Sequence, residues 1–78
     1  MLIRKKIREY RGESSQSTIA SKYNVSQQTW SYWELAKRTP SVVMMKKLEN
    51  DSGIPMEELF HDVFNNHRLE TNTGKGVV

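Results

Sequence analysis

Apolar residues near the start of the chain recur at intervals of three and four, which is the period of one face of an α-helix. Ile3, Ile7 and Tyr10 follow this spacing and predict a first helix over residues 2–11. Gly12 comes directly after that range and is expected to end the helix. The chain therefore opens with an amphipathic helix.

The next apolar stripe predicts a second helix that begins at Gln16 and is capped by Ser15. Its inward residues are Ile19, Ala20 and Tyr23. Asn24 follows the last of them, and asparagine tolerates the left-handed conformation in which helices often end. Val25 then fills a short turn, and Ser26 is the expected cap of a third helix.

The third helix carries Trp30 and Trp33, whose spacing of three places both on one face. This spacing favours packing in the core over the exposed stacking that aromatic residues provide in single-strand binders. The residues expected on the opposite, outward face are Gln28, Ser31, Tyr32 and Leu35. That face is mostly polar and uncharged.

Two further helices are predicted beyond a loop that Pro40 closes. Ser41 is the expected cap of a fourth helix, which Gly53 ends, and its inward residues are Val42, Met45, Leu48 and Ser52. Pro55 suits the first position of a fifth helix, whose apolar residues are Leu59, Phe60, Val63 and Phe64. Four apolar residues in six exceed what one packed face requires, so part of this helix could form a homodimer contact.

Composition bounds the chain to one domain, because 78 residues with 36% hydrophobic and 27% charged residues form a small core. We expect this domain over residues 1–66 and a flexible tail over 67–78. The absence of cysteine excludes disulfides and agrees with a reducing cytosol. Without a signal peptide or long apolar run, a cytoplasmic location is expected. The net charge of +3 favours an acidic partner only mildly.

A helix, a tight turn and a second helix with a polar outer face are what a helix-turn-helix DNA reader requires. The residues in this stretch resemble the Cro/repressor-type helix-turn-helix, or XRE, family. Within the motif the matching residues are Gln16, Ala20, Val25 and Glu34. Beyond it they are Pro40, Leu48, Gly53, Ile54 and residues 57–60, so that the resemblance covers about residues 3–64.

This resemblance implies an all-α fold, a compact five-helix bundle of the lambda-repressor-like type, with the helix-turn-helix at the second and third helices. It also implies a sequence-specific transcriptional regulator, of the small phage or mobile-element repressor type. The partner would be double-stranded DNA carrying a palindromic operator, because such domains usually bind two half-sites as dimers.

Base contacts are expected from the start of the third helix, the end that best reaches the major groove. Gln27 and Gln28 can donate and accept at once, which suits adenine, and Thr29 or Tyr32 could touch a thymine methyl group. Outside this motif, two adjacent glutamines would be read as soluble surface.

Phosphate contacts are expected around the motif. Ser31 lies one turn along the third helix, Lys37 and Arg38 follow that helix, and Ser41 begins the fourth. In the family, the glutamine at the position of Gln16 bonds a phosphate and braces the recognition helix. The basic residues from Arg4 to Arg8 are expected on the exposed face of the first helix, where they either reach phosphates or are merely solvated.

The resemblance further implies an ion pair between Arg11 and Glu34, which would tie the first helix to the third. Two local departures bear on it. The stretch from Arg11 to Gln16 is about two residues shorter than in the family, which leaves Arg8 as an alternative partner. Ala36 stands where the family usually has glycine, so the third helix could run longer or the turn could differ.

Other functions are weighed against this reading. Some relatives of this fold bind proteins, as antitoxins bind a toxin, and the apolar fifth helix would suit such an interaction module. No nucleophile with a base and no glycine-rich phosphate loop is apparent, so an enzyme is not expected. His61 and His67 are too few for a metal site, and no metal, cofactor, small-molecule ligand or membrane partner is expected.

Overall fold

Five helices follow one another in the computed structural model, which describes residues 2–64. They are α1 (Lys5–Arg11), α2 (Gln16–Lys22), α3 (Gln27–Glu34), α4 (Val42–Ser52) and α5 (Met56–Leu59), and one more helical turn spans 61–64. This range contains no strand, which confirms the all-α class. No helix in it has the length and apolar character needed to cross a membrane. The tail expected over 67–78 lies outside the described residues.

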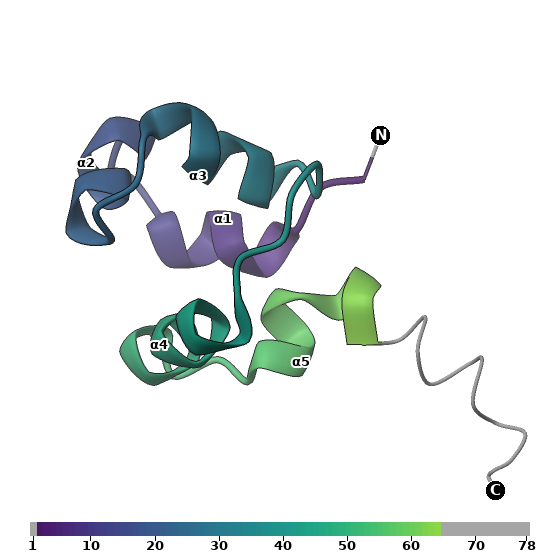
Figure 1. Cartoon of the computed structure of the whole chain (residues 1–78). Coiled ribbons are helices and arrows are strands. Elements are labelled where there is room, and N and C mark those ends of the chain that lie inside the picture. The colour runs from purple at the N-terminus through teal and green to yellow at the C-terminus, as the bar shows by residue number, and fades with distance from the viewer. Residues whose placement is uncertain (1, 65–78) are drawn as a thin grey trace, which may run out of the picture.

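The helices form two groups around α1 (Figure 1). In this view α2 and α3 lie together on one side of α1, while α4 and α5 lie on the other side. The first helix packs against both α3 and α5, so it joins the two groups. Figure 1 also shows the 35–41 connection running from the end of α3 to the start of α4 across the molecule.

Three helices begin at a serine whose hydroxyl oxygen accepts the backbone N–H three residues further on. The pairs are Ser15 with Thr18, Ser26 with Thr29, and Ser41 with Met44, at 3.0, 3.0 and 3.2 Å. Each bond satisfies an amide that the helix itself leaves unpaired, which stabilises a helix by about 1 kcal/mol. The three predicted caps are confirmed.

The core joins all five helices. Its buried members are Ile7, Ile19, Ala20, Tyr23, Trp30, Trp33, Met45, Leu48, Leu59 and Phe60. Trp30 is completely buried and stacks on Tyr23, with 5.8 Å between ring centroids. Both tryptophans face inward, as their spacing predicts. Val25 packs against this core from the turn between α2 and α3.

The fourth helix presents a different face from the one its spacing predicts. Met45 and Leu48 are buried, but Val42 is 68% exposed and Val43 is 81% exposed. Met44, rather than Val42, packs against the core beside Met45. The prediction for Val42 is wrong because the first residue of α4 lies beyond the edge of the core, where its side chain has nothing to pack against.

The fifth helix is shorter than expected, and this changes where its apolar residues lie. Its helical backbone breaks at Phe60, where φ is −119° and ψ is 48°, before the turn at 61–64 begins. This break lets Leu59 and Phe60 enter the core while Val63 and Phe64 pack against it. The apolar surplus that suggested a homodimer contact is therefore used inside the domain.

The first helix begins later than predicted, and this changes the position of Arg4. The helix starts at Lys5, the backbone of Arg4 before it is extended, and Arg4 is only 5% exposed. Lys5, Lys6 and Arg8 are exposed as expected. The expectation of an exposed Arg4 is wrong because its side chain turns inward to ion-pair with Asp62.

The turn after α3 keeps the left-handed backbone that glycine would favour. Ala36 has φ of 58°, and the helix ends at Glu34, so the alternative of a longer third helix is wrong. The N–H groups of Lys37 and Arg38 both donate to the carbonyl of Tyr32, at 2.9 and 3.3 Å, which closes this turn. The surrounding hydrogen bonds hold Ala36 in a conformation that costs an L-residue about 1–2 kcal/mol.

Replacing Ala36 with glycine should relieve this strain. The Ala36→Gly variant should gain up to about 1 kcal/mol in the free energy of unfolding, since the relief exceeds the extra entropy of glycine in the unfolded chain. Urea unfolding followed by tryptophan fluorescence measures the change. The same substitution at Ala20, inside α2 and buried, should instead destabilise by about 1 kcal/mol. A less stable Ala36→Gly protein would contradict the strain.

Candidate nucleic-acid interface

The outer face of α3 is polar and accessible, while its inner face is buried. Gln27 and Gln28 are exposed, and Thr29, Ser31 and Tyr32 are half-buried. The inward tryptophans fix which side of the helix points outward, because both are anchored in the core. The helix begins directly after the turn from α2, and its first two residues are exposed.

Both glutamines of this face hold one hydrogen bond within the domain. Gln27 donates to the side-chain oxygen of Gln16 at 3.3 Å, and Gln28 donates to the hydroxyl of Tyr32 at 2.7 Å. Each bond restricts a long side chain that would otherwise be free on the surface. In each glutamine one N–H and the oxygen remain for an outside partner.

Lys37 and Arg38 lie beside the same face. Their side chains are exposed and both cations sit over the ring of Tyr32, at 5.9 and 5.7 Å from its centroid. Such contacts are attractive by about 0.5–1 kcal/mol at exposed sites. Ser41 is exposed at the start of α4, on the other side of α1, so the structure does not bring it onto this face. Two cations and a row of hydrogen-bonding groups therefore adjoin each other on the α3 side of the molecule.

A buried carboxylate, that of Glu34, connects this face to the rest of the fold. It accepts hydrogen bonds from Arg11 at 2.5 and 3.3 Å, from the indole N–H of Trp30 at 2.6 Å, and from Gln16 at 3.2 Å. The expected pair of Arg11 with Glu34 is thus present despite the shortened connection. Arg8 lies 3.9 Å away and adds a weaker, exposed interaction with the same carboxylate.

The predicted phosphate ligand Gln16 is therefore engaged inside the domain. Its amide N–H group donates to Glu34 while its oxygen accepts from Gln27. A continuous chain of hydrogen bonds thus runs from Arg11 through Glu34 and Gln16 to Gln27. Because hydrogen bonds in such chains strengthen one another, the first residue of α3 is oriented by a buried ion pair.

The hydrogen-bond donors around Glu34 lower the pKa of its carboxyl group. Its burial by itself would raise the pKa, but the hydrogen bonds from Arg11, Trp30 and Gln16 outweigh burial and lower it below its ordinary value of 4.5. Glu34 is accordingly ionised at neutral pH. The group is a buried charge that accepts hydrogen bonds from three different side chains.

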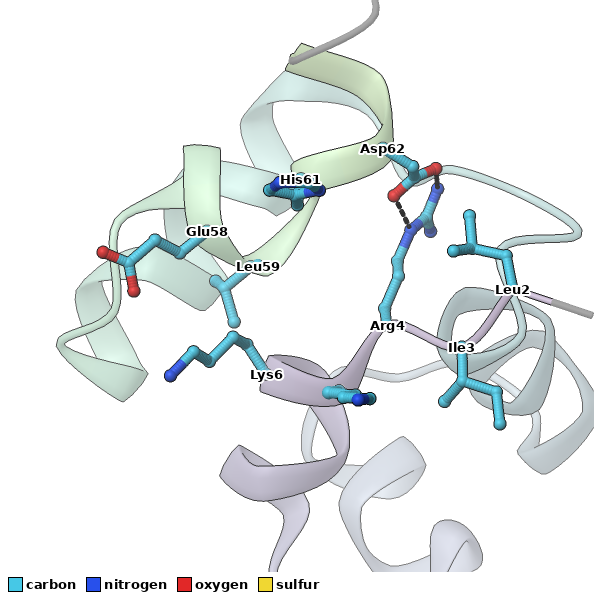
Figure 2. A pocket seen from close by; sticks show the side chains of 9 residues that line it. Leu2, Ile3, Arg4, Lys6, Glu58, Leu59, His61 and Asp62 are labelled. Carbon is cyan, nitrogen blue, oxygen red and sulfur yellow. Dashed lines mark hydrogen bonds and ion pairs between the residues drawn. The ribbon is translucent and has the colours of Figure 1, made fainter.

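Arg4 forms a second buried ion pair that the sequence reading did not identify. Its Nε and Nη2 atoms contact the two carboxylate oxygens of Asp62 at 2.8 and 3.0 Å (Figure 2). The same bonds lower the pKa of Asp62 below its ordinary value of 3.8. One signal was available: Arg4 lies three residues before Ile7, on the inward stripe. Nothing in a single sequence pairs it with a residue 58 positions away.

A hollow of about 310 Å³ lies beside this ion pair, between the N-terminal segment and α5 (Figure 2). Leu2, Ile3 and Leu59 supply its apolar lining, and charged or polar side chains complete its wall: Arg4, Lys5, Lys6, Glu58, His61 and Asp62. None of the base- or phosphate-contacting residues expected on α3 or beside it lines the hollow, whereas three of the basic residues from Arg4 to Arg8 do. Among residues 2–64, no three carboxylate or histidine side chains gather in a way that could hold a metal ion.

Comparisons of the chain with protein-family models, with curated proteins and with solved structures found no match. The function of this face must therefore be argued from its own geometry.

The lowered pKa values of Glu34 and Asp62 predict that the protein loses stability in acid. A carboxyl whose pKa is lower in the folded state contributes stability that is fully present above its unfolded pKa and disappears as the pH falls through the folded value. For Glu34 and Asp62 the loss should begin below about pH 4.5 and continue below their lowered values. Urea midpoints measured between pH 7 and pH 2 test this.

The Glu34→Gln variant separates the contribution of Glu34 to this pH dependence from that of Asp62. It should be less stable at pH 7 by about 3 kcal/mol, since it leaves Arg11 without its buried partner, and its midpoint should depend less on pH. Glu13→Gln alters an exposed carboxylate and should keep the wild-type profile. An unchanged pH dependence in Glu34→Gln would contradict the assignment.

Proposed function

We propose that this protein is a sequence-specific, double-stranded DNA-binding regulator of transcription that reads the major groove with α3. The observation that carries the proposal is the two-sided character of α3 after a tight turn. Its tryptophans anchor one side in the core, and its first residues, Gln27 and Gln28, stand exposed on the other. An α-helix presented in this way fits the major groove, and its N-terminal residues reach base edges.

The proposed base contacts follow from the side chains of this face. A glutamine can accept from N6 and donate to N7 of adenine, so Gln27 and Gln28 favour A·T-rich half-sites. Thr29 and Tyr32 would then meet thymine methyl groups. The hydrogen bonds from Gln27 to Gln16 and from Gln28 to Tyr32 support this assignment, because side chains that are already oriented lose less entropy on binding.

The proposed phosphate contacts lie on both sides of α3. Lys37 and Arg38 would bind the backbone beyond its C-terminal end, with the exposed side of Ser31 adding a hydrogen bond. Gln16 would act mainly by bracing Gln27, and any bond from it to a phosphate would use the N–H that Glu34 leaves over. These contacts set the register of the helix on DNA, whereas the glutamines read sequence.

The fold we propose is the lambda-repressor-like arrangement, with the helix-turn-helix formed by α2 and α3. A domain of this size covers one half-site, so useful specificity requires two copies on a palindromic operator about one helical turn apart. The resemblance to Cro-type proteins favours a small repressor of phage or mobile-element type.

A protein-interaction module, such as an antitoxin of the same fold, is the second candidate. The apolar fifth helix no longer supports it, but Val42 and Val43 form an exposed apolar pair at the start of α4. The two candidates differ in their response to salt. A DNA complex weakens steeply as salt rises, whereas a complex formed on apolar residues does not.

The Gln28→Ala variant tests the base-reading assignment. After an operator is selected from random DNA, this variant should bind it about 1–3 kcal/mol more weakly and should accept other bases at one position. Fluorescence anisotropy on the operator, its single-base variants and random DNA measures both effects. An equal loss on the operator and on random DNA would refute base reading by Gln28.

The Lys37→Ala variant tests the phosphate contacts. It should weaken binding to all sequences alike and reduce the slope of log affinity against log salt by about 0.9. Lys46→Ala removes an exposed lysine of α4, which lies on the opposite side of α1 from α3, and should leave both quantities unchanged (Figure 1). If the two variants behave alike, Lys37 makes no specific contact.

A further inference from the structure

The guanidinium of Arg4 uses all five of its N–H groups inside the domain. Besides the two bonds to Asp62, Nη1 donates to the carbonyl oxygens of Trp33 and Arg38, both at 3.0 Å, and Nη2 donates to the hydroxyl of Thr39 at 2.9 Å. Three of the five bonds therefore go to the end of α3 and the segment that follows it. Arg4 also lies over the ring of Phe60, 5.0 Å from its centroid.

These bonds hold the Lys37–Arg38 segment from one side while α3 holds it from the other. The backbone N–H groups of Lys37 and Arg38 donate to the carbonyl of Tyr32, and the carbonyl of Arg38 accepts from Arg4. The segment has no regular secondary structure of its own. Its position relative to α3 is thus set by one hydrogen-bonded turn and one buried side chain.

Asp62 in turn determines where the guanidinium lies. Its two carboxylate oxygens accept from Nε and Nη2 together. This bidentate contact fixes the plane of the guanidinium and also compensates its positive charge. Without this carboxylate, a nearly buried cation would face carbonyl and hydroxyl dipoles and the ring of Phe60 but no opposite charge, and it would move toward water. Such a movement would release the carbonyls of Trp33 and Arg38.

We propose that Arg4 and Asp62 are positioning residues that hold Lys37 and Arg38 where they contact DNA phosphates. DNA affinity would then depend on an ion pair formed with the turn that follows α5, although neither partner touches DNA. This inference rests on the proposed DNA-binding function and extends it to a part of the chain that the helix-turn-helix does not include.

The Asp62→Asn variant tests the proposal because it keeps the shape of the side chain and removes its charge. The variant should bind the selected operator and random DNA about threefold to tenfold more weakly, by the same factor on both, with a shallower salt dependence. Its preference among bases should be unchanged, since Gln27 and Gln28 are held by other contacts. Binding equal to wild type by a folded Asp62→Asn protein would overturn the proposal.

A thermodynamic cycle with the Lys37→Ala/Arg38→Ala double variant separates positioning from general loss of stability. If Asp62 acts through the Lys37–Arg38 segment, the Asp62→Asn change should cost little further affinity once both cations are absent. Additive losses would overturn the proposal. Glu49→Gln is the matched control, because Glu49 also bonds a cation and a backbone N–H but lies on α4, away from this segment. It should change urea stability without changing DNA affinity.

Hydrogen exchange distinguishes failure of this inference from failure of the proposed function. The amides of Lys37 and Arg38 should exchange faster in Asp62→Asn than in wild type, whether or not the protein binds DNA. Equal exchange would refute the mechanical link itself, whereas faster exchange in a protein that binds no DNA would refute only the function. If Asp62→Asn does not fold, Thr39→Val removes a single bond to Arg4 and should produce the same changes on a smaller scale.

Discussion

The fold depends most on the need to compensate the buried carboxylate of Glu34. Taking an unpaired carboxylate out of water costs several kcal/mol, so its position is tolerable only when donors surround it. Arg11 comes from α1, Gln16 from α2 and Trp30 from α3 itself, and no one of these helices can move without removing a donor. The orientation of the turn between α2 and α3 is therefore specified by charge compensation as well as by apolar packing.

The first helix connects the two halves of the molecule through arginines at its two ends. Arg11 closes on Glu34, and Arg4, just before the helix, closes on Asp62 beyond α5. The backbone N–H of Arg4 also donates to the carbonyl of Glu34 at 2.7 Å. Every buried polar side-chain atom within residues 2–64 has a hydrogen-bond partner. The networks around Glu34 and Arg4 are therefore fully satisfied, and such networks favour a single arrangement of the helices.

The sequence predicted features that depend on neighbours along the chain. Serine caps, the glycine stop at Gly53 and the inward tryptophans all follow from local spacing, and the structure shows each of them. The pair of Arg11 with Glu34 was anticipated only through resemblance to a family. It could not come from periodicity, because a helical stripe shows which residues face inward and not which residues meet there.

The features that were missed depend on where helices end and on contacts between distant segments. Val42 is in phase with the core residues of α4 but lies beyond the edge of the core. The break at Phe60 depends on packing against other helices, which the sequence pattern does not show. The apolar run around Phe60 therefore predicts one long helix with more apolar residues than one packed face requires. For Arg4 the sequence predicts an exposed side chain because arginines are mostly exposed, and its partner lies 58 residues away.

The serine caps have a consequence for how the chain reaches this structure. Each of three helices carries its own start signal within four residues, so those helices can form transiently before any tertiary contact exists. The remaining search consists of docking short, locally encoded units around α1, and folds dominated by such local contacts assemble in microseconds to milliseconds. The two partly buried ion pairs join residues 23 and 58 positions apart, so closing them costs more loop entropy than forming the local caps does.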